Sequence, residues 1–109
     1  MPVGKSTSLF DIEPPLPGTE RFDELYRKGS VRIERIVSSG TQAPAIYVQE
    51  QDEWVALLKG TARLRVGEET LSLREGDCLA LPAKVPHEVL ETSEGAIWLA
   101  VHVHPLSTG

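Results

Sequence analysis

Short segments with strand-like alternation, separated by turn residues at close intervals, are the feature that most constrains this fold. The clearest segment spans 61–66, where Ala62, Leu64 and Val66 alternate with polar residues, as expected of a strand with one buried face. Gly67-Glu68 follows and favours a hairpin into a second alternating segment at 70–73. Further strand-like runs occupy 31–34, 45–49, 54–58, 78–81, 87–91 and 96–103. Many short strands with frequent turns predict an all-β sandwich or barrel.

The first 28 residues differ in composition from the rest of the chain. Residues 1–18 are rich in Pro, Gly and Ser, which favours an extended arm lying on the domain or on a partner subunit. Within 19–28, Phe22, Leu25 and Tyr26 have helix-like spacing, and Gly29 would end a helix there. We therefore expect an N-terminal arm and one short helical segment over 1–28, packed on a barrel formed by 29–109.

Composition narrows the class of protein. A chain of 109 residues is expected to form one domain. Its formal net charge of −5 argues against nucleic-acid binding, and it has no apolar run of about 20 residues that could span a bilayer. The lack of a signal-like N-terminus and the single cysteine, Cys78, predict a cytoplasmic protein. We expect Cys78 to be a buried apolar filler, and Trp54 and Trp98 to lie in the core or an interface.

Two spaced motifs connect these segments to a known family. Glu53 and Gly60 match the E-x6-G end of the motif G-x5-H-x-H-x3/4-E-x6-G. Gly76, Pro82 and His87 match positions of a second motif, G-x5-P-x-G-x2-H-x3-N. The chain resembles the cupin superfamily, and in particular its small single-domain bacterial members. The resemblance implies a jelly-roll β-barrel with an interior pocket for a small molecule, and a homodimer.

The chain departs from these motifs at positions that matter for chemistry. Tyr47 and Gln49 stand where the family has two histidines that ligate a metal, and Lys84 and Glu91 replace the Gly and Asn of the second motif. In metal-binding cupins, the histidines, the glutamate and the second-motif histidine converge on one divalent ion. The resemblance therefore implies Glu53 and His87 as ligands, with Gln49 as a neutral oxygen ligand.

Strand alternation adds one more candidate. His102 lies in the apolar run 97–103, where we expect its side chain to face the interior and to need a hydrogen-bond or metal partner. Gln49, Glu53, His87 and His102 are thus the predicted metal set, suited to Zn²⁺, Fe²⁺, Mn²⁺ or Ni²⁺. The alternative is a barrel without metal, in which Glu53 and His87 form a buried hydrogen-bonded pair. By the same alternation Glu91 would be a second pocket carboxylate, whereas His104 is expected to be exposed.

Three functional hypotheses follow. The first is a metal-dependent enzyme acting on a small organic molecule. The second is a barrel that binds a small ligand without catalysis. The third is a metal-free enzyme of the epimerase or isomerase kind, with Glu53 and His87 as the catalytic acid and base.

Overall fold

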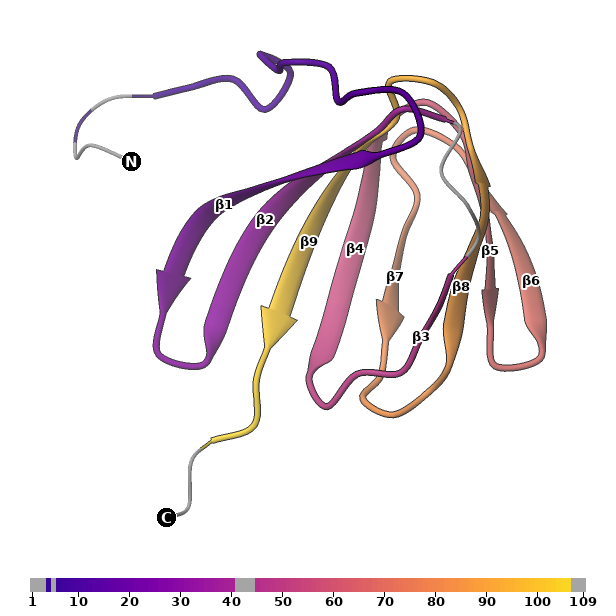
Figure 1. Ribbon diagram of the computed structural model, residues 1–109. Coiled ribbons are helices and arrows are strands. Elements are labelled where there is room, and N and C mark those ends of the chain that lie inside the picture. The colour runs from indigo at the N-terminus through magenta and orange to yellow at the C-terminus, as the bar shows by residue number, and fades with distance from the viewer. Residues whose placement is uncertain (1–3, 5, 41–44, 107–109) are drawn as a thin grey trace.

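The fold consists of two antiparallel β-sheets that face one another (Figure 1). The computed structural model describes residue 4, residues 6–40 and residues 45–106. These residues form nine strands and no helix, which confirms the all-β prediction. The described part of the chain therefore contains no helix that is long and apolar enough to cross a bilayer.

The strands divide five to four between the sheets. The first sheet has the order β1 (Glu20–Lys28), β2 (Val31–Ser38), β9 (Ile97–Val103), β4 (Asp52–Lys59) and β7 (Cys78–Leu81). The second has the order β3 (Ile46–Tyr47), β8 (His87–Thr92), β5 (Ala62–Val66) and β6 (Glu69–Leu73). Since β2 and β4 both pair with β9, residues far apart in the sequence meet at the centre of the first sheet.

The predicted hairpin between β5 and β6 is confirmed. Val66 pairs with Glu69, so that Gly67 and Glu68 alone make the turn. Gly67 has a φ of 59°, a left-handed conformation that glycine adopts without steric strain. In this register Leu64 lies opposite Leu71 and Ala62 lies opposite Leu73, so that the alternating apolar residues of both strands share one face.

The expected helix within 19–28 is wrong, because these residues form β1. Glu24 pairs with Glu34 and Tyr26 pairs with Ile33, which leaves Leu25 as an extra residue in a β-bulge. A bulge interrupts the two-residue alternation of a strand. The resulting spacing of Phe22, Leu25 and Tyr26 therefore imitates the spacing of a helix.

The core lies between the inner faces of the two sheets. Leu57 and Trp98 from the first sheet belong to the same buried cluster as Leu64 from the second, which confirms the interior position expected of Trp98. Gly60 follows β4 at a φ of 89°, and a Cβ there would collide with the Ser93 side chain and lie 3.1 Å from the Ala96 Cα. The motif glycine is therefore required both by its backbone conformation and by its close neighbours.

The single cysteine is exposed, contrary to expectation. In β7, Leu81 is buried and Leu79 packs against the core, so that strand alternation turns Cys78 and Ala80 outward. The apolar run 78–81 suggested burial on both faces, but only one face of β7 is covered.

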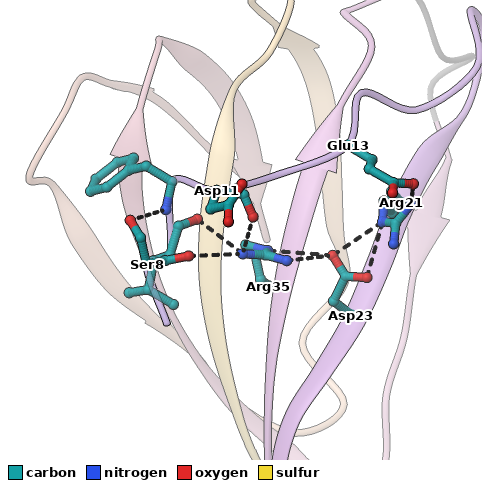
Figure 2. Close-up of polar contacts among 8 residues, drawn as sticks. Ser8, Asp11, Glu13, Arg21, Asp23 and Arg35 are labelled. Carbon is teal, nitrogen blue, oxygen red and sulfur yellow. Dashed lines mark hydrogen bonds and ion pairs between the residues drawn. The ribbon is translucent and has the colours of Figure 1, made fainter. Parts of the chain in front are cut away.

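Two arginines, Arg35 of β2 and Arg21 of β1, attach the N-terminal arm to the first sheet, and Arg21 does so by pairing with Glu13 at 3.1 Å (Figure 2). The Arg35 guanidinium donates hydrogen bonds to the carbonyl oxygens of Leu9 (3.2 Å) and Asp11 (3.3 Å), and pairs with Asp23 of β1 at 3.1 Å. Burial would raise the pKa of Asp23, but hydrogen bonds from Arg35 and Arg21 outweigh it and hold that pKa below its ordinary value. The described part of the arm thus lies on its own domain.

Candidate functional site

A cavity of about 110 Å³ lies between the sheets and is lined by strands from both of them. Most of the surface that faces the cavity is apolar, and its apolar side chains are those of Phe22, Ile36, Val55, Leu64, Leu81, Val89 and Trp98. A mostly apolar pocket with a few polar groups is the usual form of a small-molecule site.

The polar part of the wall contains every residue of the predicted metal set. It consists of Glu20, Glu34, Tyr47, Gln49, Glu53, His87 and His102. Gln49, Glu53, His87 and His102 therefore all line one cavity. Glu20 and Glu34 were not predicted, and both come from strands that precede the two motifs.

A buried carboxylate–imidazole cluster forms one end of this wall. His102 is only 3% exposed, and its Nε2 lies 2.8 Å from Glu34 Oε1 and 3.8 Å from Glu53 Oε2. Glu53 and His102 are directly opposite one another in the β4–β9 pair. The other oxygen of Glu34, Oε2, accepts a hydrogen bond from Arg32 at 2.8 Å. Two carboxylates thus flank one imidazole, which bonds to Glu34, and among the described residues only Glu34 of the two also pairs with an arginine.

The two acidic residues from β1 and β2 have pKa values that shift in opposite directions. Burial would raise the pKa of Glu34, but the hydrogen bond from His102 and the charge of Arg32 outweigh it, so that this pKa is lowered. Burial raises the pKa of Glu20, to which no described arginine or histidine donates a hydrogen bond.

Two glutamines complete the cluster. Gln49 donates a hydrogen bond from Nε2 to Glu53 Oε1 at 2.8 Å, and the Gln51 amide nitrogen lies 3.3 Å from His102 Nδ1. Because an amide nitrogen can only donate, Nδ1 of His102 accepts, and its Nε2 carries the proton donated to Glu34. Both ring nitrogens of His102 are therefore engaged within the protein.

This arrangement does not fit a metal centre. A metal ligand must offer a free lone pair, but both His102 nitrogens are occupied and Gln49 turns its amide nitrogen toward Glu53. No group of three or more His, Cys, Asp or Glu side chains within 6–40 and 45–106 is placed to hold an ion. The hydrogen bonds of this arrangement therefore give no support to the predicted metal site.

His87 differs from the rest of the polar wall because its Nδ1 has no partner within the described residues. The side chain is 8% exposed and lines the cavity. Tyr47 lies opposite it in the β3–β8 pair and stacks on the imidazole, with 5.6 Å between ring centroids. A buried polar atom without a partner is rare in proteins and marks a site where a ligand can supply the missing bond.

Two further expectations about the second motif have different outcomes. Glu91 does not enter the cavity, because Leu90 is an extra residue in a bulge opposite β5. The bulge reverses the alternation, and the exposed Glu91 pairs instead with Arg63 on the outer face. Lys84, at the glycine position of the motif, adopts the left-handed φ of 66° that favours glycine, with its side chain exposed.

His104 was expected to be exposed, but its side chain is partly buried. Its ring stacks on His102 with 6.2 Å between centroids, and its Nε2 has no hydrogen-bond partner in the described part of the chain. It does not line the cavity.

Comparison with known proteins identifies the family. A family model for the cupin domain matches residues 33–102, which include both motifs and the carboxylate–imidazole cluster. The chain belongs to the cupin family. No curated protein matches this cupin.

Solved structures resemble this cupin over nearly its whole length. A protein from Ralstonia eutropha JMP134, described as a putative mannose-6-phosphate isomerase, is 35% identical with a TM-score of 0.83, over 93% of this chain and 99% of that one. A conserved protein of unknown function from Streptococcus pyogenes is 22% identical with a TM-score of 0.78, over 98% and 93%. A cupin superfamily protein from Desulfitobacterium hafniense DCB-2 is 16% identical with a TM-score of 0.80, over 96% and 95%. The last two likenesses concern the fold alone.

Proposed function

We propose that this cupin binds a small organic molecule directly through its own side chains, with His87 and Glu53 as the polar contacts. The observation that carries the proposal is the unpartnered Nδ1 of the buried His87. An unsatisfied buried polar group costs about 1–3 kcal/mol, which a ligand that hydrogen-bonds to it would recover. The apolar wall of the cavity would hold the rest of the molecule.

We expect His87→Leu to weaken ligand binding while leaving stability unchanged or slightly raised. Leucine fills a similar volume and removes the unpartnered nitrogen, so that the folded state loses a destabilising group. Small organic fragments would be screened by NMR, and those that shift the amides of pocket-lining strands would be titrated into both proteins. Their affinity should fall at least about tenfold in the variant, the equivalent of one lost hydrogen bond.

His104→Leu is the matched control. It removes a buried nitrogen that also has no partner within the described residues but lies outside the cavity wall, so fragment affinity should not change. If His87 were only structural, His87→Leu would lower the melting temperature and leave fragment binding intact. That result would overturn the proposal.

Because Gln49 hydrogen-bonds to Glu53 and His102 hydrogen-bonds to Glu34, we expect untagged protein to contain much less than one transition-metal ion per chain. Elemental analysis after loading with Zn²⁺, Fe²⁺, Mn²⁺ or Ni²⁺ would measure this. One equivalent of bound metal that is lost in Glu53→Gln would contradict the expectation and support a metal-dependent function.

A second candidate is a metal-free isomerase in which His87 and Glu53 move a proton between neighbouring atoms of the ligand. Its support is the 35% identity to the Ralstonia protein named as an isomerase. Incorporation of solvent deuterium into a bound aldose would favour this candidate over binding alone.

A further inference from the structure

Resting on the proposed function, we infer that the natural ligand carries an ammonium group on a small apolar or aromatic body, and that phosphorylated molecules are excluded. Three properties of the cavity support this inference: its uncompensated carboxylates, the aromatic rings beside them, and the absence of Lys and Arg from the described lining.

The charge of the cavity wall is negative. Glu20, Glu34 and Glu53 line it, and no Lys or Arg of the described residues does. Arg32 pairs with Glu34 and offsets that charge, but no described Lys or Arg forms an ion pair with Glu20 or Glu53. Two carboxylates are therefore available to a cationic ligand. An ammonium group could donate a hydrogen bond to either of them.

Aromatic rings also line the cavity. Phe22 is two residues from Glu20 on β1, so that both side chains point to the cavity, and it is 57% exposed. Tyr47 is 42% exposed and also lines the cavity. The face of an aromatic ring attracts an organic cation, and this attraction adds to that of a nearby carboxylate. Large aromatic side chains left open beside acidic groups thus match an amine with an apolar body.

The same wall disfavours phosphate. A phosphoryl group would bring about two negative charges next to Glu20 and Glu53, with no described lining cation to neutralise them. Phosphate sites in proteins are usually built from Arg, Lys or backbone N–H groups. The chemistry of this pocket therefore differs from that of a site for a sugar phosphate.

A matched series of benzyl compounds would test the inference. Benzylamine, benzyl alcohol and benzyl phosphate share one ring and differ in charge, and a single ring suits a cavity of about 110 Å³. NMR titrations at constant ionic strength and pH 7 would follow the amides of β1, β4, β8 and β9. We expect benzylamine to bind at least about tenfold tighter than benzyl phosphate, with benzyl alcohol between them.

Two variants give the test a control. Glu20→Gln should weaken benzylamine about fivefold without changing benzyl alcohol, because only the charge is removed. Glu68→Gln, in the β5–β6 turn outside the cavity, should change neither. Benzyl phosphate binding as tightly as benzylamine, or an equal effect of Glu20→Gln on both probes, would overturn the inference but leave the proposed function standing. If none of the three compounds shifts the pocket amides, the inference is wrong, and the fragment screen with His87→Leu decides separately whether the proposed function stands.

Discussion

Replacing Glu34 with alanine is expected to lower the free energy of unfolding by about 3–5 kcal/mol, the range found when one partner of a buried ion pair is removed. Glu34 is 7% exposed and accepts hydrogen bonds from both His102 and Arg32. Alanine would leave the His102 imidazole and the Arg32 guanidinium without their common acceptor in a water-poor site. Urea denaturation followed by fluorescence would measure the change, since two tryptophans are present.

Two variants separate the role of Glu34 from that of any glutamate in an ion pair. Glu91→Ala makes the same change in an exposed pair with Arg63 and should alter stability by no more than about 1 kcal/mol. Glu34→Gln keeps an oxygen acceptor and should destabilise less than Glu34→Ala. Equal effects of the two alanine variants would show that burial of the Glu34 cluster contributes nothing.

The effect of Glu34→Gln should also depend on pH. The pKa of Glu34 is lowered from its ordinary value of 4.5, so that the folded state favours the ionised form. The resulting stability is fully present above about pH 4.5 and is lost as the pH falls through the lower folded-state pKa. The difference in stability between wild type and Glu34→Gln should therefore shrink as the solution is acidified below pH 4.5.

The parts of the fold that depend on local sequence were predictable. Alternation on both sides of Gly67-Glu68 predicted the β5–β6 hairpin, and the motif spacing placed Gly60 at a position that excludes a side chain. The bulge at Leu25 was not predictable in this way, because it exists only through pairing with β2. The spacing of apolar residues within a single segment cannot distinguish such a bulge from a helical turn.

The candidate site shows the same division between local and long-range information. The motifs and strand alternation identified Glu53, His87 and His102 as candidates, and all three line one cavity. The role of Glu34 depends on β2 lying beside β9, a contact between residues 68 positions apart. Alternation within 31–34 indicated a strand with two faces, but not which face would meet the second sheet. Glu34 is buried on the inner face because His102 and Arg32 donate hydrogen bonds to its carboxylate there.

Replacing Trp98 with alanine is expected to destabilise the protein by about 3–5 kcal/mol, because it removes a large buried ring from the core. Trp98 is 5% exposed, pairs with Ile36 and Leu57 across neighbouring strands, and lines the cavity. Trp98→Phe keeps most of the apolar contact and should be destabilised much less. Trp54→Ala, at a position that is 41% exposed, is the matched control and should also have a much smaller effect.

Because Trp98 forms both core and cavity wall, its loss should enlarge the existing pocket. An apolar cavity of this kind can bind an aromatic molecule that replaces the missing side chain. Added indole should therefore raise the melting temperature of Trp98→Ala but not that of Trp54→Ala, since a ligand that binds only the folded state stabilises it. If indole has no effect on a folded Trp98→Ala protein, the two sheets have closed over the vacated space. The cavity would then be maintained by the Trp98 ring rather than by the frame of strands around it.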